Sequence, residues 1–340
     1  MSETEKKPTP VPPAPPAPLP DGSVFQVETV QPESIFGLSP TVRRLSRSRS
    51  ALFGLIVVAI LVLTALLAPL LSPHDMAMQY RSATKLPPMS RIPMEEIRAE
   101  FHGMPEGQFR PARTNLFILG TDKFGRDILS RILYGAQISL IVGVLAEIIA
   151  VLIGVTIGAL AGYFGGLLDS ILMRLTDTFF AFPSLLLAIG ILAVFEKPGL
   201  FTIFVALGVV GWTSIARIVR GQVLSVKEED FVEAARAMGS SDTRIILRHI
   251  LPNSLAPIIV VGTLGIAGNI LSEAGLSFLG LGVQPPTPSW GIMLAEGRNL
   301  IEIAPWVCVF PGLAILFTVL GFNLLGDGLR DALDPRLKVQ

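Results

Sequence analysis

The chain has 340 residues, of which 51% are hydrophobic and 16% charged, with a mean hydropathy of +0.61. Soluble domains carry roughly a quarter charged residues, so this composition indicates a polytopic membrane protein. The 27 basic residues equal the 27 acidic ones, which gives no electrostatic basis for a nucleic-acid partner. One cysteine and three scattered histidines offer neither an intrachain disulfide nor a metal site.

The N-terminal part of the chain is rich in proline. Residues 1–44 contain no apolar segment of the kind that forms a secretory signal, and residues 8–20 are mostly proline. Proline fixes φ and removes a backbone donor, so we expect a disordered tail over residues 1–44. A binding site for a proline-recognition module is the alternative.

Six apolar runs are each long enough to cross a bilayer, which needs about 20 apolar residues per helix. We therefore expect a first helix within residues 45–71, an external segment at 72–136, a core of five helices at 137–328 and a C-terminal tail at 329–340. The six predicted spans are 51–71, 138–161, 170–195, 201–219, 254–281 and 304–325.

The charge distribution predicts the orientation of these spans. Excess Lys and Arg remain cytoplasmic, and the arginines at 43, 44, 47 and 49 precede the first span. Both termini and the loop at 220–253 are then cytoplasmic, in a multi-pass protein of the inner (plasma) membrane. The segment at 72–137 carries nine Lys or Arg residues, but loops longer than about 60 residues escape this rule. We expect it to form an external subdomain.

The loop at 220–253 contains an amphipathic pattern. Apolar residues recur at i, i+3, i+4 and i+7, namely Phe231, Ala234, Ala235 and Met238, which predicts one face of a helix. Gly239 predicts a left-handed turn that ends this helix. Asp242 is expected to cap the next helix and Pro252 to end it. Such a helix in an internal loop is either a binding surface for a soluble partner or an ordinary connector.

This loop resembles the EAA loop of ABC importer permeases. The family pattern is Glu-Ala-Ala, three residues, Gly, and then a fixed interval to Leu-Pro, with Ile where this chain has His249. In that family the loop is a coupling helix, here 229–239, which seats in a cleft of the cytoplasmic ATPase. The resemblance implies ATPase coupling by six residues: Glu233, Ala234, Ala235, Gly239, Leu251 and Pro252.

Four further stretches resemble the C-type subunit of the dipeptide/oligopeptide/nickel branch of that family. They are residues 119–127, 162–177, 278–291 and 323–335. The resemblance implies an all-α polytopic fold with six transmembrane helices, that of a type I ABC importer permease. It also implies a homologous permease partner, two ATPase subunits or domains, and an external binding protein that delivers short peptides. Nickel or another small peptide-like solute is the alternative.

The chain itself contains no G-x-x-x-x-G-K-[ST] phosphate loop and no recognisable nucleophile–base set. We therefore expect no catalysis and no cofactor in this chain, with ATP and Mg²⁺ bound by partner subunits.

Several polar residues have plain structural interpretations. Asp122 is expected to cap the helix that enters the second span, and Arg126 to lie at headgroup level. Trp290 suits the membrane interface. Arg174 and Asp177 share a helical face and are expected to form a local ion pair.

Two carboxylates, Glu147 and Glu273, fall inside predicted spans. A charge at the bilayer centre costs at least ~2.5 kcal/mol, so neither should face lipid. Glu147 shares a helical arc with Gly154 and Gly158, whose G-x-x-x-G spacing lets another helix approach closely. Glu147 is thus expected in a helix contact or in the translocation path. An ion-coupled secondary transporter that uses both carboxylates as proton or sodium sites is the competing class.

Overall fold

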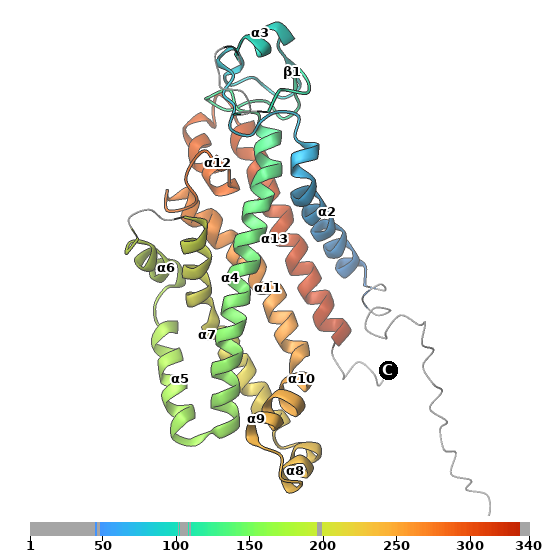
Figure 1. Ribbon diagram of the computed structural model, residues 1–340, viewed down its shortest axis with the longest axis vertical. Coiled ribbons are helices and arrows are strands. Elements are labelled where there is room, and N and C mark those ends of the chain that lie inside the picture. The colour runs from blue at the N-terminus through green and yellow to red at the C-terminus, as the bar shows by residue number, and fades with distance from the viewer. Residues whose placement is uncertain are drawn as a thin grey trace, which may run out of the picture. The chain divides into compact units, whose positions relative to one another are not determined.

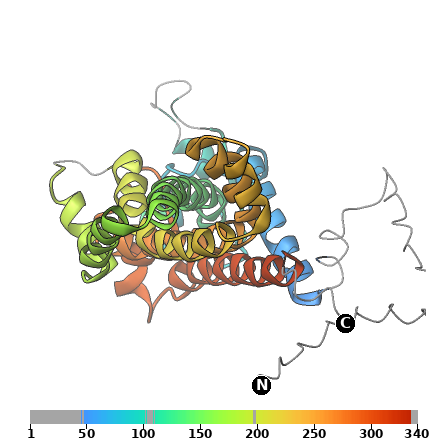
Figure 2. The same ribbon diagram turned by 90° about the horizontal axis from the view of Figure 1, so that it is seen from below.

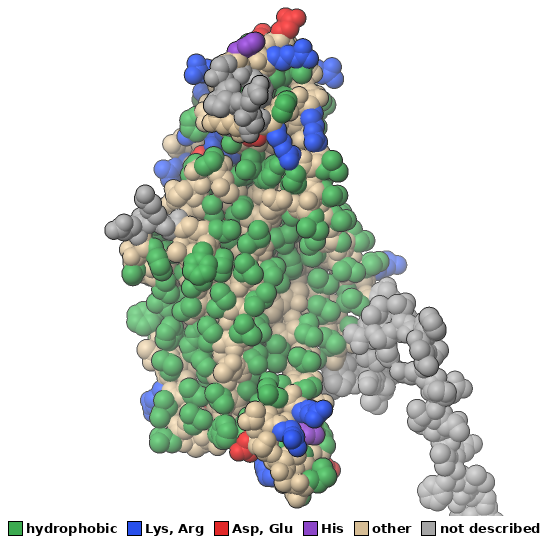
Figure 3. Space-filling model, in the orientation of Figure 1, with side chains coloured by type: hydrophobic (Ala, Val, Ile, Leu, Met, Phe, Trp, Pro, Cys, Tyr) green, Lys and Arg blue, Asp and Glu red, His purple; other side chains and the backbone are tan. Residues whose placement is uncertain are grey.

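The computed structural model describes residues 45, 48–100, 102, 108, 110–195 and 199–333, which lie in one compact unit, residues 39–340. In this described part, five helices are long and apolar enough to cross a membrane, and a bent helix pair is a sixth candidate span. The long helices run side by side (Figure 1). Hydrophobic side chains cover the middle of the face in Figure 3, whereas charged side chains gather near its two ends. The predicted tail 1–44 lies outside the described residues.

The candidate spans are α2 (Arg49–Leu71), α4 (Ile128–Phe164), α5 (Gly166–Phe180) with α6 (Ser184–Leu192), α7 (Leu200–Val226), α11 (Leu255–Phe278) and α13 (Trp306–Leu333). The shorter elements are η1 (Arg81–Ala83), β1 (Ser90–Arg91), α3 (Met94–Ala99), β2 (Leu116–Phe117), α8 (Asp230–Ala237), α9 (Asp242–Ile245), η2 (Ile246–Ile250), α10 (Leu251–Asn253), α12 (Trp290–Gly297) and η3 (Arg298–Leu300).

The second span begins earlier than predicted. α4 starts at Ile128 rather than at 138, so the external segment ends near Asp127 instead of at 136. Asp127, not Asp122, caps this helix, because its carboxylate accepts a hydrogen bond from the Ser130 N–H at 2.8 Å. The prediction placed the start where hydropathy rises, but the helix also contains the polar turns that precede the apolar run.

The third span is broken. The predicted run 170–195 is divided into α5 and α6, whose axes differ by 86°. Pro183 stands immediately before α6, and a proline disfavours the helical conformation of the residue before it.

At the C-terminal end of the described residues, α13 continues to Leu333, so residues 329–333 of the predicted tail are helical. Hydropathy marks only the apolar part of such a helix.

Side chains predicted at the membrane surface are buried instead. Arg126 is 5% exposed and Trp290 is 1% exposed. The Trp290 indole N–H donates to the Ile132 carbonyl oxygen at 3.1 Å. Trp290 therefore fastens α12 to α4 and does not mark a lipid boundary.

A glycine seam joins α4 to α7. A Cβ on Gly158 would lie 2.9 Å from the Val219 Cβ and 3.0 Å from the Arg220 nitrogen, and Gly154 and Gly162 meet α7 in the same way. The predicted close approach at the G-x-x-x-G step is confirmed. α4 also contacts α11 and α2, and it lies among these helices when seen from the α8 end (Figure 2, green).

The segment between α2 and α4, which the sequence predicts to be external, has a small core of its own. Its buried side chains are Met78, Tyr80, Ala83, Ile92, Ile97 and Phe117. β1 pairs antiparallel with β2, and the His74 ring stacks on Phe117 with ring centroids 4.5 Å apart. The guanidinium groups of Arg110 and Arg113 donate to the last carbonyls of α2, those of Pro69 and Leu70. This layer lies at the end of the helices opposite α8 (Figure 1).

Two glycine-to-alanine substitutions test the seam. Gly158→Ala should lower the thermal midpoint of the purified protein, because overpacking a tight contact costs roughly 1–3 kcal/mol. Gly221→Ala in α7 is the matched control, since no atom from another part of the described structure lies within 4 Å of the added methyl. It should raise the midpoint, because alanine is favoured over glycine in helices by about 1 kcal/mol. Equal midpoints for the two variants would contradict the seam.

Candidate functional site

The loop from α8 to α10 lies at one end of the long helices (Figure 1). The predicted amphipathic helix is present as α8, but its inward face differs from the prediction. Val232 and Ala235 are buried, whereas Phe231 is 41% exposed and Met238 is 79% exposed. Of the predicted apolar face, only Ala235 is buried, and the two largest side chains point away from this chain. Bare apolar side chains on an ordered helix are typical of an interaction surface.

Gly239 ends α8 in the left-handed conformation that the sequence predicts, with φ of +79°. The Ser240 N–H donates to the Ala235 carbonyl at 3.1 Å, and the Gly239 N–H to the Arg236 carbonyl at 3.0 Å. These two bonds form a Schellman motif. Among the described residues, none beyond the chain neighbours lies within 4 Å of the place a Cβ would occupy, so the need for glycine here is conformational and not steric.

Asp242 does not cap α9 as predicted. It is the first residue of α9, after Ser241, and its carboxylate accepts a hydrogen bond from the Tyr163 hydroxyl at 2.6 Å. Tyr163 stands in the last turn of α4, and the Arg236 guanidinium of α8 lies 6.0 Å from the centre of its ring. The side chain of Asp242 therefore ties the loop to α4.

Pro252 lies one residue before the end of a helical stretch, close to where the sequence predicts the end. The chain continues through α9, η2 and α10, which ends at Asn253, and a turn at Ser254 separates α10 from α11. η2 is a π-helical turn in which the Leu251 N–H donates to the Ile246 carbonyl. A proline has no N–H, so it fits where a widened turn has already changed the hydrogen-bond register. The Asn253 side chain donates to the His249 carbonyl at 2.6 Å. Leu251 is half-buried and Pro252 exposed.

Ion pairs connect α5 to α7, and they replace the local pair predicted between Arg174 and Asp177. Asp177 accepts a hydrogen bond from Arg217 at 2.7 Å. Asp169 binds the Arg220 guanidinium through both oxygens, each at 2.6 Å. Long arginine side chains reach across to the next helix. A bidentate guanidinium–carboxylate pair between helices is favoured over a single ion pair within one helix.

The intramembrane carboxylates both lie in helix contacts. Glu147 is 5% exposed and accepts a hydrogen bond from the Asn269 side chain of α11 at 2.9 Å. Gly265 leaves room for this carboxylate, because a Cβ at that position would overlap it. Glu273 is fully buried and accepts a hydrogen bond from the Ser277 hydroxyl at 2.6 Å. Any role of the two residues in transport stays a prediction.

A groove of about 770 Å³, which the sequence analysis did not predict, lies among α7, α11 and the end of α13. Polar side chains line it together with apolar ones: Gln222, Ser225, Asn253 and Arg330. The groove is built from segments that are far apart in the sequence. The one sequence feature that could have indicated a polar lining is Arg330, a charged residue near the end of an apolar run.

Comparison with known proteins gives consistent matches. Residues 154–339 match the family model described as "Binding-protein-dependent transport system inner membrane component". Residues 39–88 match the "N-terminal TM domain of oligopeptide transport permease C". The dipeptide transport system permease protein DppC of Alkalihalophilus pseudofirmus is 42% identical over 87% of this chain and 89% of its own length. The glutathione transport system permease protein GsiD of Shigella flexneri is 46% identical with the same coverage.

Solved structures agree at the level of the fold. Structures titled inward-facing conformations of the MetNI methionine ABC transporter match with TM-scores of 0.52 and 0.51, each at 19% identity. The better of these covers 61% of this chain and 98% of the other. At this identity the likeness concerns the fold alone.

These matches define a membrane transport subunit with the type I ABC importer permease fold. The chain belongs to the family of binding-protein-dependent transport system inner membrane components. The predicted family and all-α polytopic fold are confirmed, and the competing class of ion-coupled secondary transporter is not supported.

Substitutions at Glu147 test its role. Glu147→Gln should preserve folding, because the amide oxygen can still accept from Asn269. Glu147→Leu leaves that amide unpaired at a cost of roughly 1–3 kcal/mol, so the thermal midpoint should fall. If the bond is only structural, uptake per folded complex stays near the wild-type rate in both variants. A normal midpoint with lost uptake in Glu147→Leu would assign Glu147 to the path or gate instead.

Proposed function

We propose that this chain is one permease subunit of an ATP-driven importer of short peptides, which an external solute-binding protein delivers. The named solutes of its relatives support the substrate class, since the relatives are permeases for dipeptides and for glutathione. A homologous permease is the proposed partner in the membrane. Nickel and other small peptide-like solutes are the alternative cargo. Purifying the binding protein with its ligand, and identifying that ligand by mass spectrometry, decides between them.

One observation supports the proposal most strongly, the geometry of α8. Its backbone is fixed by the Gly239 motif, by buried Val232 and Ala235, and by the bond between Asp242 and Tyr163. An ordered helix that nonetheless leaves Phe231 and Met238 bare fits a surface that seats on another protein. We assign that protein as an ATPase subunit, which binds ATP and Mg²⁺, because this chain carries no phosphate loop.

In the proposed mechanism, ATP closes the pair of ATPase subunits and displaces α8. Two connections carry the displacement into the membrane. The Asp242–Tyr163 bond leads to α4, and the chain through Leu251 and Pro252 leads, after one turn residue, to α11. Rocking of these helices alternately opens the solute path outward and inward. We place that path along the groove that Gln222 and Arg330 line, whose mixed polarity suits a peptide.

We also propose that the α8 loop and both termini are cytoplasmic. Basic side chains gather in the described segments at this end, and the positive-inside rule puts such segments in the cytoplasm. They are Arg217, Arg220, Lys227, Arg236, Arg244 and Arg248. The ATPase would then meet α8 in the compartment that supplies ATP.

Substitutions at Gly239 test coupling. Gly239→Val forces a β-branched residue into a left-handed conformation, at a cost of roughly 1–2 kcal/mol, and should abolish solute-stimulated ATP hydrolysis in a complex that still assembles. Gly239→Asn is the matched control, because asparagine tolerates positive φ, and it should keep most of the stimulation. Glu233→Lys, which inverts an exposed charge on α8, should also uncouple. Normal uptake by Gly239→Val and Glu233→Lys would refute the assignment of α8.

Cysteine reporters test the orientation. In a Cys308→Ser background, Ser82→Cys in the external segment and Ser240→Cys after α8 should react with an impermeant reagent from opposite sides of the membrane. We expect Ser82→Cys to react in intact cells and Ser240→Cys only in inverted vesicles. Reaction of both from the same side would overturn the topology.

A further inference from the structure

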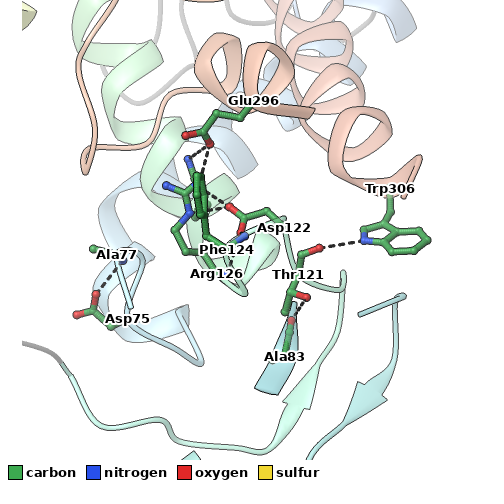
Figure 4. Close-up of polar contacts among 10 residues, drawn as sticks. Asp75, Ala77, Ala83, Thr121, Asp122, Phe124, Arg126, Glu296 and Trp306 are labelled. Atoms are coloured by element: carbon green, nitrogen blue, oxygen red, sulfur yellow. Dashed lines mark hydrogen bonds and ion pairs between the residues drawn. The ribbon is translucent and has the colours of Figure 1, made fainter. Parts of the chain in front are cut away.

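A ring of four charged side chains lies buried at the end of the helices opposite α8. Asp122 and Arg126 come from the turn before α4, Arg131 from the first turns of α4, and Glu296 from α12. The four side chains are 5%, 6%, 2% and 18% exposed, respectively. Figure 4 shows Arg126 between Asp122 and Glu296.

Each carboxylate in the ring accepts hydrogen bonds from both guanidinium groups. Arg126 donates to Asp122 and to Glu296, at 2.6 Å in both cases. Arg131 donates to Asp122 at 2.7 Å and to Glu296 at 3.0 Å. The ring is therefore closed and contains two positive and two negative charges. It joins two segments that are far apart in the sequence, the stretch 122–131 and α12.

The turn that carries Asp122 is held firmly. The second oxygen of Asp122 accepts hydrogen bonds from the N–H groups of Phe124 and Arg126, at 2.8 and 3.0 Å. The neighbouring Thr121 carbonyl accepts from the Trp306 indole at the start of α13, at 3.2 Å (Figure 4). The turn thus presents Asp122 and Arg126 from a fixed position on the external segment.

Glu296 is the ring member that belongs to α12. This helix is fastened at its first residue by Trp290, which bonds α4, and close to its last residue by Glu296. Between these points α12 packs on α11 and α13. Without Glu296, the second end of α12 would lose its link to the external segment.

Stability alone is a weak reason for such a ring. Removing four charges from water carries a large desolvation cost, and apolar replacements of buried ion pairs are often neutral or stabilising. The ring instead fixes the relative orientation of the segments that carry it, because paired guanidinium and carboxylate groups bond in a specific geometry. A ring that links the external segment to α12 therefore fixes the position of one relative to the other.

We propose that Glu296 is a positioning residue, and that the ring clamps α12 to the external segment. A partner that binds the external segment then displaces α12 together with the outer ends of α11 and α13. This inference rests on the proposed function, in which the external binding protein is that partner. Arg126 and Arg131 act with Glu296 through the same clamp.

A double substitution separates the clamp from a stabilising role. Glu296→Met with Arg131→Met removes one charge of each sign, keeps the volume, and leaves the Asp122–Arg126 pair intact. In the assembled transporter, we expect a wild-type basal ATPase rate but about a tenfold loss of stimulation by the external binding protein, within the usual range of coupling between sites. Glu302→Met, at an exposed acid between η3 and α13, is the control and should keep full stimulation. Full stimulation of the double variant would overturn the clamp.

A distance measurement does not depend on activity. Spin labels on Ser82→Cys and Asn299→Cys, both exposed, report the separation between the external segment and the end of α12 in a Cys308→Ser background. Pulsed electron paramagnetic resonance should give a narrow distance distribution with Glu296 and a broad one with Glu296→Gln. An unchanged width would refute the clamp. Failure of the wild-type complex to respond to any binding protein would instead refute the proposed function, and the spin-label result would still decide on the ring.

Discussion

The close contact of α4 with α7 is the constraint on which the rest of the structure depends. Gly154 and Gly158 let the two backbones approach, and the seam holds α4 in one position. α4 has 37 residues and is about 55 Å long at 1.5 Å per residue. Arg131 near its first end enters the charged ring, Glu147 bonds α11 at mid-length, and Tyr163 at the far end bonds the α8 loop.

Several polar contacts between charged or amide side chains join different helices. Asp169 with Arg220 joins α5 to α7, and Glu147 with Asn269 joins α4 to α11. In a bilayer, no hydrophobic driving force favours contact between two helices over contact with lipid tails. Close packing at small residues and interhelical hydrogen bonds therefore determine which helices associate. The same rule explains why glycine, and not a large apolar side chain, lies where α4 meets α7.

The sequence predicted the family, the all-α fold and the Gly239 turn, because each of these depends on local spacing or on residues close in the chain. It placed Asp122 at a helix cap and paired Arg174 with Asp177, because a local partner was the only one visible. The actual partners, such as Glu296, come from distant segments. The π-helical turn before Pro252 was not predicted, since such a turn leaves no clear pattern in the sequence.

The central claim is that α8 seats on an ATPase, and site-specific photo-crosslinking tests it most directly. A photoreactive phenylalanine analogue at Phe231, in the complex co-expressed with its ATPase subunits, should form a covalent adduct with the ATPase. The same analogue at Leu66, which is 70% exposed on α2, should form none. Adducts of position 231 with lipid or with this chain alone, in a complex that contains the ATPase, would contradict the account.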